Sequence, residues 1–340
     1  MPALAIAGRP VPRSLAALLA VAALAVLPGV GTAAATRADT VSVIDTASGA
    51  LVARVPVGQL PVGLAVAADG SHVYVSNRDS ASISVLETAS NTVVATLPVP
   101  GVPEALALLP DGSRLYVADR KNATAVVLDT ASGRLIASVA LDGVPEGLAV
   151  APDGSMVYVG TSARDAVDLL DPTTNAISSV VAMPAAPQSL ASSTDGSSLY
   201  VATYDTHARR GGSLVVLNAV TDSISPVLTF DTAPQALVVA PDNRRAFVTH
   251  LGSVGLSFVD LAAPGSAMDV PLAGLPAGLV LVPDGSSLYV ATGVAPSQVT
   301  TIDATTGQVT AGVALDGTAQ GVAMAPDGSR VYVAHRSDGL

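Results

Sequence analysis

Histidine and glutamate side chains are the groups of this 340-residue chain that could hold a divalent metal. The candidates are His250, His335, Glu104 and Glu146, because imidazole and carboxylate groups ligate the metals that serve lyases and hydrolases. The four lie far apart in the sequence, so only the fold could gather them, and they fall short of a defined ligand set. The chain has no cysteine, which excludes disulfides, thiolate catalysis and cysteine-type zinc sites. No cofactor is therefore predicted, with a divalent metal as the alternative.

Basic residues offer a second kind of chemistry. Two of the 16 basic residues, Arg9 and Arg13, precede residue 35, and half of the remaining 14 lie in short stretches between apolar runs. These seven are Arg78, Arg120, Lys121, Arg164, Arg209, Arg210 and Arg336. Because arginine forks match carboxylates and phosphates, they could bind an anionic ligand or an acidic protein surface. The alternative is that they pair with aspartates of the same stretches, which are Asp79, Asp119, Asp165, Asp205 and Asp338.

Other partners are disfavoured by composition. The formal net charge of −11 argues against nucleic acid, because phosphate binding needs a basic surface. Glycan sites usually present exposed aromatic platforms, and six of the seven tyrosines occupy one repeated position, which leaves only Tyr204 outside it. The sequence also contains no Ser-His-Asp spacing, phosphate-binding loop, EF-hand loop or HExxH motif.

The N-terminal 35 residues are of a different kind. Arg9 and Arg13 precede an apolar run of 13 residues, 15–27, which is followed by Pro28, Gly29 and the small residues "GTAAAT". This pattern predicts a signal peptide over residues 1–35 and a secreted, extracellular or cell-wall-associated protein. The run is shorter than the roughly 20 residues of a membrane span. The alternative is an uncleaved anchor; otherwise no membrane span is expected after cleavage.

The rest of the chain, residues 36–340, is repetitive. An aspartate in a "DG" or "DN" turn returns at steps of 42, 42, 42, 47, 42 and 43 residues. Its seven copies are Asp69, Asp111, Asp153, Asp195, Asp242, Asp284 and Asp327. An aromatic residue follows each aspartate by five positions, at Tyr74, Tyr116, Tyr158, Tyr200, Phe247, Tyr289 and Tyr332. A fixed period of this length indicates a repeat architecture.

Each unit contains four short apolar runs separated by turns. In one unit the runs are "EGLAV", "MVYVG", "AVDLL" and "AISSVVAM", and the turns between them include "APDGS" and "DPTTN". Proline presets φ in the first turn and glycine takes its positive-φ position. Four strands in about 40–45 residues is typical of a β-propeller blade. The sequence therefore predicts an all-β protein, a seven-bladed propeller with four antiparallel strands per blade.

The last unit stops after two strands. The segment 41–58, "VSVIDTASGALVARVPVG", supplies a third and a fourth strand with nothing of the repeat before them. Because an open ring would expose two strand edges, we expect these N-terminal strands to complete the last blade beside the two C-terminal strands. The two ends of the domain should then lie side by side.

Alternate connections of a propeller lie on opposite faces. The "PDG" and "DTASG" turns share one face, the turn face, where the repeated residues predict turn chemistry alone. The loops between second and third strands, together with the connections between blades, form the variable face, where function is expected. Its candidate ligand-binding residues are Asn77, Arg78, Asp119, Arg120, Tyr204, His207, Arg209, Arg210, His250, His335 and Arg336. Near the start of each first strand, a ring of positions should surround the mouth of the central channel on this face, at Val62, Glu104, Glu146, Gln188, Gln235, Ala277 and Gln320.

Several words of the repeat resemble the YVTN-type β-propeller family, which includes surface-layer and secreted bacterial proteins. They are "YVSN" at residues 74–77, "PDGS…YV" in most units, and the segment 41–58. The resemblance covers residues 41–340 and implies the propeller fold, but this architecture hosts binding proteins, scaffolds and enzymes alike. Only Asn77 keeps the asparagine of the family word; the other units have Asp119, Thr161, Thr203, His250, Thr292 and His335 there.

A regular repeat without a catalytic signature favours a binding or scaffold function. We expect a secreted monomer that uses its variable face to bind a protein or a small anionic ligand at or outside the cell surface. The alternative is a propeller enzyme of the lactonase, lyase or hydrolase kind, with its site at the channel mouth.

Overall fold

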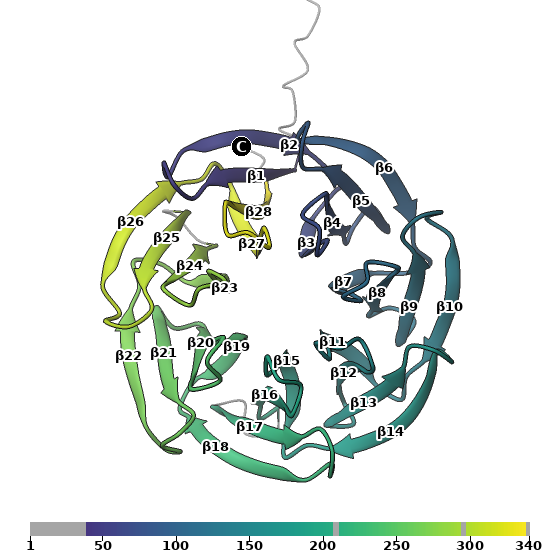
Figure 1. The fold of residues 1–340 in the computed structure, drawn as a ribbon, viewed down its shortest axis with the longest axis vertical. Coiled ribbons are helices and arrows are strands. Elements are labelled where there is room, and N and C mark those ends of the chain that lie inside the picture. Colours follow the sequence, from purple (N-terminus) through teal and green to yellow (C-terminus); the bar gives the residue numbers. More distant parts are fainter. Residues whose placement is uncertain (1–38, 207–210, 294–296, 338–340) are drawn as a thin grey trace, which may run out of the picture. The chain divides into compact units, whose positions relative to one another are not determined.

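A computed structural model describes residues 39–206, 211–293 and 297–337 of the chain. These residues form 28 strands in seven four-stranded antiparallel sheets, and no helix. The sheets stand as blades around a common axis (Figure 1), with one strand of each blade at the centre and one at the rim. The predicted seven-bladed propeller is confirmed. The candidates His207, Arg209 and Arg210, Asp338, and the predicted signal peptide 1–35 lie outside the described residues.

Within each blade the strands follow one another from the axis to the rim. Blades 1 to 3 consist of β3 (Pro61–Val66), β4 (His72–Asn77), β5 (Ser82–Glu87) and β6 (Thr92–Pro98); β7 (Pro103–Leu108), β8 (Arg114–Asp119), β9 (Thr124–Asp129) and β10 (Leu135–Ala140); and β11 (Val144–Val150), β12 (Val157–Ser162), β13 (Ala166–Asp171) and β14 (Ala176–Ala182). Blades 4 to 6 consist of β15 (Ala186–Ser192), β16 (Ser198–Tyr204), β17 (Gly212–Asn218) and β18 (Ile224–Phe230); β19 (Ala233–Val239), β20 (Arg245–Leu251), β21 (Gly255–Asp260) and β22 (Ala267–Pro271); and β23 (Pro276–Leu281), β24 (Ser287–Thr292), β25 (Gln298–Asp303) and β26 (Val309–Ala314). Blade 7 consists of β27 (Thr318–Met324), β28 (Arg330–Arg336), β1 (Thr40–Asp45) and β2 (Leu51–Pro56).

Local turn chemistry ends the first strand of each blade. In blade 2 the Oδ1 atom of Asp111 accepts hydrogen bonds from the backbone N and the Oγ of Ser113, at 2.9 and 2.8 Å. Gly112 takes a φ of +71° between them, which glycine adopts without strain. These bonds also hold the pKa of the Asp111 carboxyl below its usual value. The sequence therefore fixes this turn locally, before any contact between blades.

The core lies between the blades. Seven apolar clusters each combine residues of two neighbouring blades. Each cluster contains one copy of the repeated aromatic residue; Tyr116, for example, packs with Val127 of its own blade and Val157 of blade 3. No single blade can bury its apolar faces alone, so the stability of one blade depends on its neighbours.

Blade 7 closes the ring, as predicted. Its β1 pairs antiparallel with β28 from Thr40 opposite His335 to Asp45 opposite Arg330, so the first and the last strands of the propeller lie side by side (Figure 1). Asp39 adds a polar link, because its carboxylate accepts hydrogen bonds from the backbone N–H groups of Ser337, at 2.8 Å, and Leu60, at 2.6 Å. We call the β1–β28 pairing the seam.

Arginines on the turn face connect neighbouring blades. Arg330, at the start of β28, donates to the carbonyl of Thr88 in blade 1 at 2.7 Å. Arg114 and Arg245, at the same place in blades 2 and 5, donate to the carbonyls of Pro172 and Ala304 in the following blades. None of the described residues belongs to a helix long and apolar enough to cross a membrane.

Candidate functional site

A β-bulge near the start of each first strand shapes the centre of the variable face. The pairing between first and second strands shifts register between Pro103 and Leu106 in blade 2 and between Pro145 and Leu148 in blade 3. The other five blades shift at the equivalent place. A bulge leaves its residues outside the ladder and redirects their side chains. The residues so placed include Glu104, Glu146, Gln188, Gln235 and Gln320, all partly exposed on the innermost strands.

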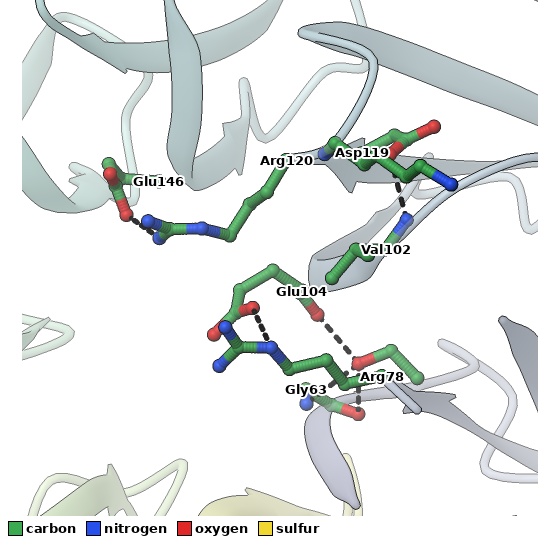
Figure 2. A network of polar contacts seen from close by, with 9 residues as sticks. Gly63, Arg78, Val102, Glu104, Asp119, Arg120 and Glu146 are labelled. Carbon is green, nitrogen blue, oxygen red and sulfur yellow. Dashed lines mark hydrogen bonds and ion pairs between the residues drawn. The ribbon is translucent and has the colours of Figure 1, made fainter. Parts of the chain in front are cut away.

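Two arginine–glutamate pairs join neighbouring blades at this centre. Arg78, which follows β4, approaches Glu104 of β7 with 3.7 Å between Nε and Oε2. Arg120, which follows β8, binds Oε2 of Glu146 on β11. Figure 2 shows both pairs, each guanidinium directed at the carboxylate of the next blade. We call these four residues the axial cluster.

The two glutamates of the axial cluster are held differently. Glu146 is fixed on both oxygens, because the Oγ of Ser162 donates to Oε1 at 2.8 Å while Arg120 binds Oε2. Glu104 accepts no hydrogen bond on Oε2 from any described residue, since its 3.7 Å contact with Arg78 is too long for one. The Oε2 atom of Glu104 can therefore accept a further hydrogen bond.

Burial raises the pKa of the Glu104 carboxyl above its usual value. Arg78 and Arg120 act in the opposite direction, and the negative charge of Glu146 adds to the rise. The chain of alternating charges is thus electrostatically connected from blade 1 to blade 3. The axial cluster is therefore suited to bind an anion through its arginines and to exchange a proton at Glu104.

Arg164, a further arginine of the variable face, also pairs outside its own loop. Arg164 pairs with Asp142 of the preceding connection at 3.0 Å, where both side chains are exposed. For Arg78, Arg120 and Arg164, the ion pairs are therefore with neighbouring connections or blades, and not with aspartates of their own loops. Arg336 is exposed at the end of β28, and Tyr204 is partly buried at the end of β16.

Four candidates at the fourth position of the YVTN-type motif lie inside the blades instead of on the variable face. Asn77, Asp119, His250 and His335 are all buried. Asp119 accepts a hydrogen bond from the backbone N of Val102 at 2.9 Å (Figure 2), which fastens the loop of blade 2 to the connection before it. The place in the repeat that looked ligand-facing is thus an inner corner of each blade, and the expectation that these four side chains lie on the variable face is wrong.

Both buried histidines bond to hydroxyls of the adjacent third strand. His335 Nε2 lies 2.7 Å from Ser42 Oγ and 2.9 Å from Thr40 Oγ1, across the seam. His250 Nε2 lies 2.8 Å from Ser257 Oγ, which in turn donates to Asp269 at 2.6 Å. Burial is the main cause that lowers the pKa of each imidazole. Neither histidine is directed at the axial cluster.

The proposed metal ligands are accordingly not gathered. His250 and His335 are engaged in blades 5 and 7, whereas Glu104 and Glu146 face arginines in blades 1 and 2. Within residues 39–206, 211–293 and 297–337, no group of three or more histidines and carboxylates could hold a metal ion. These four residues therefore do not form one donor set.

Two serines that sequence reasoning missed position the axial cluster. Ser162 holds Glu146, and the Oγ of Ser76 donates to the backbone carbonyl of Glu104 at 2.6 Å while accepting from the N–H of Gly63 at 2.8 Å. Gly63 permits this approach, because a Cβ at that position would lie 2.3 Å from the same carbonyl. In the sequence, the only signal for Ser76 was a serine directly after the apolar run "VYV" of the second strand.

Seven four-stranded blades around one axis make the chain a β-propeller. A family model described as YNCE-like beta-propeller matches residues 36–153, and no curated protein matches the chain. Among solved structures, Kuenenia stuttgartiensis hydrazine synthase is similar at 20% sequence identity and a TM-score of 0.75, over 82% of this chain and 94% of that one. At this identity the likeness shows the fold alone. The family model covers about a third of the chain, so the likeness to the YVTN-type β-propellers stays a resemblance, and the fold is what the comparisons show.

Proposed function

We propose that this chain is a secreted propeller that binds an anionic ligand, or a carboxylate on a partner protein, at the axial cluster. The observation that carries the proposal is Arg78. Its side chain is 42% exposed, and its Nε lies 3.7 Å from Glu104 Oε2, too far for a hydrogen bond. Arg78 makes no ion pair with any described residue other than Glu104, and a guanidinium binds carboxylates best through two parallel N–H groups.

The surroundings of Arg78 support the same ligand class. Lys121 is exposed and adds positive charge on the loop of blade 2. Around the rest of the axis, uncharged amides of Gln188, Gln235 and Gln320 replace the glutamates and can hydrogen-bond polar groups of a ligand. A small polar carboxylate fits this combination of one charged side and one amide side.

Glu104 makes binding dependent on pH. An anion beside Glu104 favours the protonated carboxyl, and burial already raises the pKa of that group. By linkage, affinity for an anion that keeps its charge in acid, such as methanesulfonate, should rise as the pH falls below 7. Glu104→Gln should bind such anions more tightly than the parent at pH 7, with a flatter pH dependence. The proposal fails if the variant binds no better.

Arginine variants test the site directly. Arg78→Ala should weaken binding of citrate about tenfold, as expected for one lost charge-assisted contact, and should reduce the salt dependence. Arg134→Ala is the matched control, because it removes the same charge from an exposed arginine on the turn face. Isothermal titration at low and at physiological salt measures both variants. Equal affinities in the two variants would place the anion elsewhere.

A catalytic alternative rests on the raised pKa of Glu104. A partly buried carboxyl beside arginines is suited to act as a general acid or base in lactone or ester hydrolysis. Turnover of a lactone that disappears in Glu104→Gln, while citrate still binds, would favour an enzyme. Saturable binding without turnover would favour the binding protein.

Secretion as a monomer is the remaining part of the proposal, and it rests on the N-terminal sequence. Expression of the full chain in a bacterium should yield exported protein that begins near residue 36, as read by mass spectrometry of the N-terminal peptide. Light scattering of the exported protein should give the mass of one chain. Retention of residues 1–35 in the membrane fraction would support the uncleaved anchor instead.

A further inference from the structure

A groove on the turn face, opposite the axial cluster, lies where blade 5 meets blade 6. Its volume is about 670 Å³. Arg244, Phe258 and Met268 of blade 5 line it, together with Thr305 of blade 6. In Figure 1 these two blades are the neighbouring sheets β19–β22 and β23–β26. The repeat predicts only turn chemistry on this face, so the composition of the groove needs a separate explanation.

Three positions of the groove depart from the repeat together. Where blade 5 has Arg244, the other six blades have the serine that bonds the turn aspartate, at Ser71, Ser113, Ser155, Ser197, Ser286 and Ser329. Where blade 5 has Phe258, the other blades have Val43, Val85, Val127, Leu169, Val216 and Thr301. Met268 lies directly opposite Phe258 in the ladder, and the residues opposite those six are Ala53, Ala95, Ala137, Ser179, Ser225 and Ala311.

The large side chains of this pair give the groove an apolar wall. The Phe258 ring packs edge-on against Phe247, with centroids 4.8 Å apart and planes at 88°, which fixes its orientation. Met268 is 44% exposed, whereas the six residues at its position in the other blades are alanines and serines, which offer much less apolar surface. An exposed thioether beside a fixed ring makes favourable contacts with a further aromatic ring. The wall is therefore suited to a flat apolar group.

The charge available to a ligand comes from Arg244. Its neighbour Arg245 is already committed, because it donates to the carbonyl of Ala304 and lies over the Phe247 ring at 5.8 Å. The Arg244 side chain is exposed and forms no ion pair with the residues that the structure describes. Two carboxylates also line the groove, and each accepts a backbone N–H: Asp242 from Arg244 and Asp260 from Ala262. Because these carboxylates repel anions, we expect a ligand to carry a single anionic group, placed beside Arg244.

We propose that this groove is a second binding site, independent of the axial cluster, for a flat aromatic molecule that carries one carboxylate or sulfonate. The ring lies against the exposed side chain of Met268, which covers the buried ring of Phe258, and the anionic group pairs with Arg244. The other six blades lack all three residues, so the site occurs once in the ring.

A matched pair of fluorescent probes separates the two contributions. 1-Anilinonaphthalene-8-sulfonate carries the anionic group, and N-phenyl-1-naphthylamine has the same rings without it. The folded parent protein should bind both probes, the sulfonate more tightly. Arg244→Ser should weaken the sulfonate about tenfold and leave the uncharged probe unchanged. Met268→Ala and Phe258→Val should weaken both probes.

The repeat itself supplies variants that preserve the fold. Each substitution installs a residue that other blades carry at the same position, and thermal melts confirm that the variants unfold cooperatively. Arg134→Ser is the control, because it removes one positive charge elsewhere on the turn face. The proposal is overturned if Arg244→Ser binds the sulfonate as the parent does, or if Arg134→Ser weakens it equally. It is also overturned if Met268→Ala binds both probes unchanged.

Discussion

The seam should open more readily in acid because of one buried histidine. His335 is 3% exposed, and its Nε2 contacts Thr40 and Ser42 of β1. Burial and the nearby charge of Arg54 lower the pKa of this imidazole, against smaller opposing effects of Asp316 and Asp39. The folded state therefore keeps His335 neutral at pH values where the unfolded chain, with a pKa of about 6.5, takes up a proton. Stability is fully present above that value and is lost as the pH falls below it.

The size of the effect follows from linkage. If the folded state takes up no proton on His335, the free energy of unfolding falls by about 1.4 kcal/mol between pH 8 and pH 5.5. His250 is buried in the same way and its pKa is lowered for the same reason, so the two together account for up to about 3 kcal/mol. A loss of this size is a large fraction of the stability of an ordinary domain.

Blade 1 supplies the variant that isolates His335. There Asn77, at the same place, donates to Ser84 and Ser82 at 2.9 and 3.2 Å, which are the counterparts of Ser42 and Thr40. His335→Asn should therefore keep the hydrogen bonds of the seam and remove the proton-binding group. Urea denaturation from pH 8 to pH 5 should show a shallower fall in stability for this variant, by up to about 1.4 kcal/mol at pH 5.5.

The control is His72→Asn, because His72 is partly exposed on the turn face, away from the seam. It removes one histidine and leaves the contacts of the seam in place. If His335→Asn loses stability in acid as steeply as the parent, protonation of His335 does not weaken the seam and the reasoning is wrong.

Three further outcomes are expected. Asp168 is fully buried, and burial is the main cause that raises the pKa of its carboxyl. Asp168→Val, the residue of blade 2 at this place, should raise the urea midpoint at pH 7. This advantage should be lost in acid, as the carboxyl of the parent becomes protonated. Gly321→Ala would place a Cβ 2.0 Å from the carbonyl of Val62 in blade 1 and should cost about 1–3 kcal/mol, measured by the same titration. Deletion of residues 40–56 removes β1 and β2 and should abolish the cooperative melt seen by circular dichroism, whereas a variant that melts like the parent would show that the ring does not need its seam.

The fold was predictable because its signals are local and repeated. The turn at Asp111 and Gly112 forms from its own residues, and seven copies of it set the positions of the strands. The completion of blade 7 by strands from both ends of the domain was predictable from the number of strands, because an open ring would leave two strand edges unpaired. The predicted runs of the third unit agree with β11 to β14 to within two residues at each end.

The candidate site was predictable only in part, because its contacts cross from one blade to the next. Arg120 meets Glu146 through a bulge and the angle between two blades, neither of which is encoded by spacing along the chain. The burial of His250 and His335 was not predicted, because a variable position within a repeated motif is typical of a surface residue. Here that position lies in the interior of the blade. The groove at Phe258 and Met268 needed the ladder register, because only the register shows that the two departures face each other.

The seam also determines how the propeller responds to a pulling force. Thr40 and His335 face each other at one end of the antiparallel β1–β28 pair, so the chain leaves this pair on both sides at the same end. A force applied between those two points separates the strands like a zipper and loads the inter-strand hydrogen bonds one after another instead of all at once. A propeller tethered at both ends would therefore yield first at blade 7, at a low force, before the six blades built from consecutive chain.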